Sequence, residues 1–241
     1  MCIKKKIDLK MHRKTFDFLL LNVVSLMFCV VCNNGQTSSP NSFREKPSEV
    51  KMETNVRNRI IMKALELFYI QGINSTGINQ IIKESEVAKA SFYQYFPSKD
   101  DLIYECLILY NNAYMAMLKP IMDSSSTIQE FINKTVSTVK VGIQILKNYN
   151  GCPIVNARFS MSGKLDEKFD EKFRNIIKGW EDLLCEFLSG LQKNKKIKED
   201  VDIRELSRRM IYLTEGATTM WRLTNDMEYF NDLEKIFEKF F

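Results

Sequence analysis

Residues 75–103 constrain the fold more than any other stretch, because they contain two short amphipathic helix patterns separated by only a few residues. In each pattern the apolar residues recur at helical spacing, so that one face can be buried while the other stays polar. These apolar residues are Ile78, Ile81 and Ile82 in the first pattern and Phe92 and Phe96 in the second. Two such helices with a short connection predict a helix-turn-helix.

Several residues mark where these helices should begin and end. Ser75 and Thr76 can cap the first helix, because their hydroxyls accept free backbone N–H groups. Pro97 should end the second helix, since proline restricts the residue before it and donates no hydrogen bond. Ser98 is followed by acidic residues, which are favourable in a first helical turn. We therefore expect a third helix from Ser98 to about Lys119.

The string SFYQYFPSKDDL, residues 91–102, closely resembles the recognition-helix signature of the TetR (tetracycline repressor) family of bacterial transcription regulators. The preceding helix and its glycine stop, Gly72, match the start of that family's pattern, and residues 53–105 fit without a gap. Two positions depart from the family. Glu86 stands where the turn usually has glycine, and Ala88 stands where the recognition helix usually has a serine or threonine cap. Each departure should cost only about 1 kcal/mol, which is too little to prevent the motif.

From Glu53 onward the apolar spacing predicts helices and shows no strand pattern. Beyond the helix from Ser98 to about Lys119, further helices are expected at about residues 127–149, 152–159, 166–191, 202–223 and 227–240. The resemblance implies how they are arranged. We expect an all-α fold in which residues 52–103 form an N-terminal three-helix helix-turn-helix DNA-binding domain. Residues 104–241 would then form a larger helical ligand-binding and dimerisation domain.

The formal net charge of +5 does not by itself indicate nucleic-acid binding. Residues 1–51 hold nine Lys or Arg and four Asp or Glu, so residues 52–241 hold 26 of each kind. DNA binding must then depend on where individual basic residues lie.

The residues that carry cofactor and metal chemistry are sparse. The chain has one histidine, and its six cysteines include a single CxxC, at Cys29 and Cys32, with no second such pair, so we expect neither a metal nor a cofactor. It also lacks a recognisable carboxylate pair, nucleophile with base or phosphate loop, which argues against an enzyme. Cys152 lies at a predicted helix N-terminus, where the pKa of a thiol can be lowered. A small buried residue is the simpler interpretation of Cys152.

Residues 1–51 have the outline of a secretion signal, with a basic start, an apolar run at residues 18–32 and a polar linker. The apolar run is shorter than the roughly 20 residues that a membrane-spanning helix needs. An exported helix-turn-helix would never meet its operator. We therefore expect Met52 to be the natural start, or residues 1–51 to be dispensable, and the protein to be cytoplasmic. The alternative is an exported or membrane-tethered helical binding protein, associated with the membrane through residues 18–32.

The resemblance implies that seven residues contact double-stranded DNA at a palindromic operator. Three of them should lie nearest the bases, namely Lys89, Ser91 and Gln94. Four should lie on phosphates, namely Thr76, Tyr93, Tyr95 and Lys99. The two tyrosines could instead be packing residues.

Aromatic residues recur at helical spacing through residues 104–188, which is ordinarily the mark of a buried core. A regulator nevertheless needs an input, and the resemblance favours an apolar pocket for a small-molecule effector. The candidate pocket residues are Tyr104, Tyr110, Tyr114, Phe131, Phe159 and Trp180.

The last two predicted helices carry a small-residue face and an apolar stripe. A monomer could bury both within its own bundle, whereas the resemblance implies a homodimer with a four-helix interface. The expected interface residues are Leu213, Gly216, Ala217, Met220, Leu233, Ile236 and Phe237. We therefore expect a homodimeric repressor that a ligand releases by favouring a conformation with the wrong spacing between its recognition helices.

Overall fold

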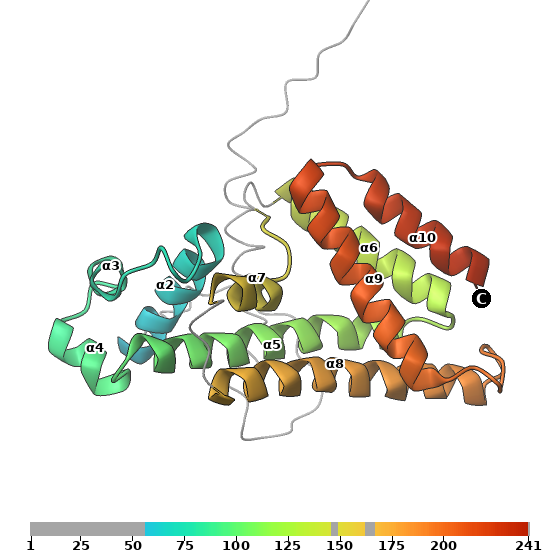
Figure 1. The fold of residues 1–241 in the computed structure, drawn as a ribbon, viewed down its shortest axis with the longest axis horizontal. Coiled ribbons are helices and arrows are strands. Elements are labelled where there is room, and N and C mark those ends of the chain that lie inside the picture. Colours follow the sequence, from blue (N-terminus) through green and yellow to red (C-terminus); the bar gives the residue numbers. More distant parts are fainter. Residues whose placement is uncertain (1–55, 146–148, 162–166, 241) are drawn as a thin grey trace, which may run out of the picture.

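The structure describes residues 56–145, 149–161 and 167–240, and in this computed structural model they form helices without a strand (Figure 1). The helices are α2 (Val56–Gln71), α3 (Ile78–Glu84), α4 (Lys89–Tyr95), α5 (Lys99–Asp123), α6 (Ile128–Ile145), α7 (Pro153–Ser160), α8 (Glu167–Lys193), α9 (Ile203–Thr224) and α10 (Glu228–Phe240). The predicted all-α fold is confirmed for these residues. Within them, no helix combines the length and the apolar character that crossing a membrane requires. The expectations for residues 1–51 and for Met52 lie outside the described ranges.

Helices α3 and α4 form the predicted helix-turn-helix, joined by residues 85–88. Glu86 has a φ of 54°, in the left-handed region that favours glycine. Ser85 holds the turn: its hydroxyl donates to the Ile81 carbonyl at 2.6 Å, and its N–H donates to the same oxygen at 2.9 Å. Helix α4 begins after Ala88, which provides no side-chain cap. The two departures from the family pattern therefore have visible consequences: Glu86 adopts a positive φ, and α4 has no side-chain cap.

The start of α3 differs from the expectation. Its N-cap is Gly77, with no side-chain cap, rather than Ser75 or Thr76. The Thr76 hydroxyl is engaged elsewhere, because it donates to the Gly72 carbonyl at 2.7 Å. The predicted cap of α5 is confirmed: the Ser98 side chain accepts the backbone N–H three residues further on, at 3.1 Å.

Helix α5 is longer than predicted, since it continues past Lys119 to Asp123 and contains Pro120. A proline at this point removes only one hydrogen bond from the helical ladder, and the helix ends within the next turn. Helix α5 also runs unbroken through the expected division between residues 52–103 and 104–241. The two proposed domains therefore share one helix.

Two apolar clusters hold the helices together. The first includes Phe92 and Trp180 and joins α2, α3 and α4 to α7 and to the N-terminal parts of α5 and α8. The second includes Leu188 and Phe230 and joins α6, α9 and α10 to the C-terminal parts of α5 and α8. Full burial of each such side chain contributes about 1.5–3 kcal/mol. Helices α5 and α8 run side by side and connect the N-terminal helices to the C-terminal bundle (Figure 1).

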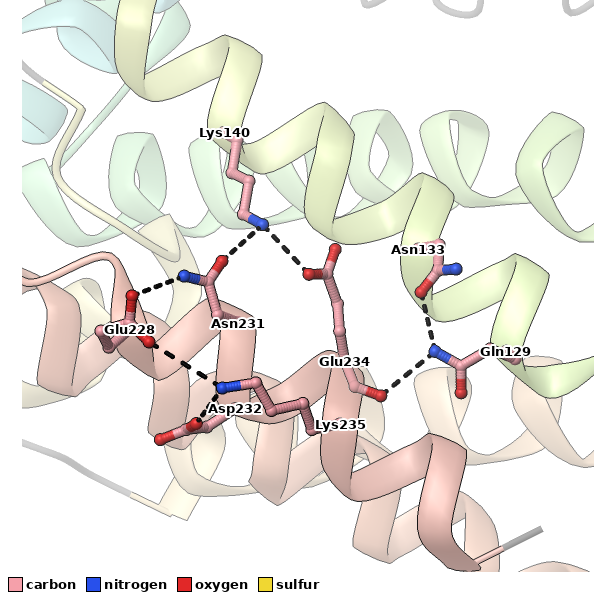
Figure 2. A network of polar contacts seen from close by, with 8 residues as sticks. All are labelled: Gln129, Asn133, Lys140, Glu228, Asn231, Asp232, Glu234 and Lys235. Atoms are coloured by element: carbon pink, nitrogen blue, oxygen red, sulfur yellow. Dashed lines mark hydrogen bonds and ion pairs between the residues drawn. The ribbon is translucent and has the colours of Figure 1, made fainter.

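A polar network fixes α10 against α6 (Figure 2). Lys140 of α6 donates to Asn231 Oδ1 at 3.0 Å and forms an ion pair with Glu234 at 3.2 Å. Gln129 of α6 donates to the Glu234 backbone carbonyl at 3.1 Å. Ion pairs as exposed as this one contribute up to about 1 kcal/mol. Together with the apolar cluster, these contacts hold α10 on its own chain.

Candidate nucleic-acid interface and ligand cavity

The outward face of α4 carries a row of polar and aromatic side chains. Lys89, Tyr93, Gln94 and Tyr95 are exposed, and Ser91 is partly exposed. Ammonium, hydroxyl and amide groups are the ones that contact phosphates and base edges in duplex DNA. The structure thus brings five of the seven expected DNA-contacting residues together on one short helix.

The opposite face of α4 is anchored in the core. Phe92 and Phe96 are buried, with their ring centroids 6.0 Å apart. The Arg57 guanidinium of α2 lies over the Phe96 ring, 5.6 Å from its centroid, and donates to Glu105 of α5 at 2.8 Å. Helices α2 and α5 therefore hold α4 in one orientation with its polar face outward.

The other two expected contacts have different environments. Thr76 is only 1% exposed, which corrects the expectation that its hydroxyl reaches a phosphate. Its side chain instead holds the connection between α2 and α3. Lys99 is partly exposed, and its Nζ donates to the Ile73 carbonyl at 2.5 Å, so it also supports that connection.

Hydrogen bonds tie α2 and the α2–α3 connection to α7 and the segment before it. The backbone N–H of Asn150 donates to the Tyr69 hydroxyl at 2.8 Å, and the Asn150 amide donates to the Tyr69 carbonyl at 2.9 Å. At the other end of α7, the Asn74 N–H donates to Ser160 Oγ at 3.3 Å, and the Asn74 amide donates to the Ser160 carbonyl. A displacement of α7 would therefore pull directly on the helix-turn-helix.

A cavity of about 410 Å³ lies where α2, α5 and α7 meet the end of α9. Tyr110 and Phe159, two of the six expected pocket residues, line it. The Tyr110 hydroxyl donates to the Leu65 carbonyl at 2.6 Å and so links α5 to α2. Among the described residues that line this cavity, Arg222 alone is charged, and its guanidinium donates to Asn156 Oδ1.

The remaining four expected pocket residues do not line this cavity. Tyr114 and Trp180 pack against each other, with ring centroids 4.7 Å apart. Tyr104 lies against Lys172, whose Nζ is 4.0 Å from the ring centroid. Phe131 is buried in the second cluster. Aromatic residues at helical spacing mark a buried face, but the spacing does not show whether that face borders a cavity.

A second hollow, a groove of about 530 Å³, runs between α7 and α8. Phe159 contributes to both hollows and is 68% exposed. The basic residues of the groove are Arg158, Arg174 and Lys178. Arg158 is already paired with Asp170 at 3.1 Å, so its charge is partly compensated.

Glu215 of α9 is a largely buried carboxyl, and its Oε2 atom has no hydrogen-bond partner among the described residues. Burial raises the pKa of Glu215 to about 7, although a hydrogen bond from Cys152 opposes the shift. Burial likewise raises the pKa of the Cys152 thiol, and the nearby Glu215 charge adds to that effect. A raised thiol pKa favours the interpretation of Cys152 as a small buried residue.

Helix α9 also presents an apolar stripe to solvent. Leu223 is 74% exposed and Tyr212 is 59% exposed, with Gly216 and Met220 exposed between them. A Cβ atom placed on Gly216 would meet nothing within 4 Å, so a second helix could approach closely there. Exposed apolar stripes of this kind mark interaction surfaces.

The structure corrects three of the expected interface residues. Ala217, Leu233 and Phe237 are buried in the second cluster of their own chain, while Leu213 and Ile236 are partly buried. Sequence reasoning missed Tyr212 and Leu223, although they lie four residues before and seven after Gly216 and so share its helical face. It also missed Arg222, for which the sequence carries no distinguishing signal.

Comparison with known families gives two matches along the chain. The model for bacterial regulatory proteins of the tetR family matches residues 60–106. The model for the tetracyclin repressor-like C-terminal domain matches residues 129–237. The first match covers the helix-turn-helix, and the second covers most of α6 to α10.

Similar individual proteins agree with these matches. The chain is 30% identical over 174 residues to the HTH-type transcriptional regulator YxaF of Bacillus subtilis, spanning 70% of this chain and 85% of that protein. It is 24% identical over 171 residues to the fatty acid metabolism regulator protein of Bacillus subtilis, spanning 71% and 85%. The crystal structure of regulatory protein TetR from Rhodobacter sphaeroides has the same fold, with a TM-score of 0.67 and 20% identity over 76% of this chain and 97% of that chain.

Proposed function

The chain belongs to the TetR family and is a DNA-binding transcriptional regulator, and on this premise we propose that it is a homodimeric repressor of a palindromic operator, released by a small organic ligand. The main support for the proposal is the orientation of α4. Its polar face is exposed, while Phe92 and Phe96 anchor the opposite face in the core. This arrangement suits a recognition helix in the major groove.

The proposed operator contacts follow from the exposed groups of α4. Lys89, Ser91 and Gln94 would face the bases, and the hydroxyls of Tyr93 and Tyr95 would reach phosphates. Lys99 would contribute positive charge near the backbone, at the start of α5. In a two-fold dimer, two such helices would enter successive major grooves, about 34 Å apart along the duplex.

The dimer itself is supported by the exposed stripe of α9. Tyr212, Gly216, Met220 and Leu223 would pack against the same residues of a second chain, with partly buried Leu213 and Ile236 at the margin. A two-fold interface uses the same surface patch on both subunits. The helical unit of residues 104–241 would then carry both dimerisation and ligand binding, as distinct from the DNA-binding unit of residues 52–103.

The protein has one conformation that can bind the operator and one that cannot. For release, the ligand must bind the second conformation more tightly than the first. The hydrogen bonds from α7 to Tyr69 and Asn74 offer a physical route between ligand and helix-turn-helix. The proposal assigns no enzymatic activity to the chain, and it places the protein in the cytoplasm, where the operator is.

The first expected result concerns α4. Tyr93→Phe should weaken binding to every operator variant alike, by about tenfold, because one hydrogen bond to a charged phosphate is lost. Gln94→Ala should instead change which base is preferred at one position, by about 1–3 kcal/mol. Both are measured by fluorescence anisotropy on a panel of duplexes carrying single base changes, after the operator has been selected from genomic fragments.

Lys193→Ala is the matched control, because this lysine is exposed at the end of α8, outside the proposed interface. It should bind every duplex as the unaltered protein does. An equal loss on all duplexes for Gln94→Ala would remove Gln94 from base readout. No selective binding to any genomic fragment would refute the operator proposal itself.

A further inference from the structure

We propose that the cavity between α2, α5 and α7 binds an amphipathic organic anion, with the carboxylate of the ligand on Arg222 and its apolar part against α5 and α7. This inference rests on the proposed function only for the consequence of binding, which is release of DNA. It names the chemical class of the effector and the place where it binds.

The positive charge in the cavity wall indicates that the ligand is an anion. Among its described lining residues Arg222 is the single charged one. The guanidinium donates to Asn156 Oδ1, and no described carboxylate lies within ion-pair distance of it. Burial raises the pKa of Tyr69 in the cavity wall, and the positive charge of Arg222 is among the effects that oppose this rise. A guanidinium with unused donors matches the planar geometry of a carboxylate, to which it can donate two hydrogen bonds.

The apolar residues in the other walls indicate that the rest of the ligand is apolar. The cavity is lined by buried apolar residues, namely Ile103 and Leu107 of α5, Phe68 of α2, Ile73 of the α2–α3 connection and Ala157 of α7. Its volume of about 410 Å³ is within the range of small-molecule sites, roughly 300–1,000 Å³. A carboxylate with an aliphatic chain or an aromatic ring would place its charge at Arg222 and remove its apolar part from water.

The position of the cavity links occupancy to the helix-turn-helix. Its walls include the last residues of α2 on one side and Asn156, Phe159 and Ser160 of α7 on the other. The hydrogen bonds from Asn74 to Ser160 close the same junction. A ligand that separates α7 from α2 would therefore strain these bonds and shift the helix-turn-helix.

The groove between α7 and α8 is the competing location. It too has an apolar floor and basic residues, but Arg158 is compensated by Asp170, and the groove is a more open surface. Arg174 is exposed and lines the groove without lining the cavity. This difference allows the two locations to be separated by mutation.

The test measures binding of octanoate and phenylbutanoate to the full chain without DNA, by calorimetry at constant pH. Both carboxylates should bind, whereas octanol and octylamine should bind at least about tenfold more weakly, because they lack the group that pairs with a guanidinium. Arg222→Gln should weaken carboxylate binding by at least about tenfold and leave octanol unchanged. Arg222→Lys should restore part of the loss, since it keeps the charge without the planar fork.

Arg174→Gln is the matched control, and it should bind octanoate as the unaltered protein does. Loss of binding in Arg174→Gln with retention in Arg222→Gln would place the anion in the groove and overturn the inference. Equal binding of octanoate and octanol, or no binding of either carboxylate, would overturn it as well. Circular dichroism and thermal unfolding establish that each variant is folded before binding is compared.

A second measurement separates this inference from the proposed function. Saturating octanoate should weaken binding of the selected operator in the unaltered protein and leave Arg222→Gln unaffected. If no operator is found, the proposed function fails while the carboxylate titrations still decide the inference. If octanoate binds through Arg222 but leaves operator affinity unchanged, the regulatory half of the inference is refuted.

Discussion

Replacing Leu223 by glutamate is expected to convert the proposed dimer into monomers and to weaken operator binding by about 100-fold or more. Leu223 is the most exposed large apolar residue of the described chain, at 74%, and it lies on the α9 stripe with Tyr212 and Met220. A charge there would have to lose its hydration at a two-fold interface, where it would face its own copy. A monomer engages only half of the operator, so the gain from simultaneous engagement of two half-sites is lost.

Sedimentation equilibrium measures the mass, and anisotropy on the selected operator measures the affinity. Val141→Glu is the matched control, because Val141 of α6 is also an exposed apolar residue and is off the α9 stripe. It should remain a dimer with unchanged affinity. A Leu223→Glu protein that is still dimeric and binds the operator as before would rule out the α9 stripe as the interface.

Replacing Glu215 by glutamine is expected to stabilise the protein at alkaline pH by up to about 3 kcal/mol. Burial raises the pKa of this carboxyl from 4.5 to about 7, and a pKa difference of one between the folded and unfolded states corresponds to about 1.4 kcal/mol. The folded state therefore holds the Glu215 proton more tightly than the unfolded state does. The contribution of Glu215 to stability is fully present below pH 4.5 and is lost as the pH rises through about 7.

Urea unfolding at a fixed protein concentration, repeated between about pH 5 and pH 8.5, measures this effect. The difference in free energy of unfolding between Glu215→Gln and the unaltered protein should be small at the acidic end, grow as the pH rises to about 7 and level off above that. Glu199→Gln is the control, because Glu199 is exposed, and its substitution should leave the pH dependence unchanged. A stabilisation that does not vary with pH would show that Glu215 is not a buried carboxyl with a raised pKa.

The helix-turn-helix was predictable because its determinants are local. The isoleucine and phenylalanine spacing places the buried faces, Pro97 stops α4 and Ser98 caps α5, and each of these effects acts within one or two helical turns. Even the two departures from the family pattern could be placed, since Glu86 takes a positive φ and Ala88 provides no cap. The prediction for Thr76 was wrong because its hydroxyl could donate either to a DNA phosphate or to a backbone carbonyl. Only the folded turn shows that it donates to the Gly72 carbonyl.

The faces of the last two helices show where local signals end. The sequence determined that α9 and α10 are amphipathic, because apolar residues recur at the helical period. It did not determine whether Leu233 and Phe237 meet their own chain or a partner, since burial in either place requires the same spacing. The position of α6, fixed by Phe230 and the Lys140–Glu234 contact, decides that they face inward and that Tyr212 and Leu223 remain outside.

The cavity proposed to bind the ligand was decided by tertiary structure alone. Its walls come from segments that are far apart in the sequence, with Phe68 in α2, Leu107 in α5, Ala157 in α7 and Arg222 in α9. By itself the sequence determined that this chain is a helical TetR-type regulator, because the recognition helix and its flanking signals lie within thirty consecutive residues. Which side chains enclose an empty volume, and which charges lack a partner, depend on how distant helices pack, and no spacing along one helix records that.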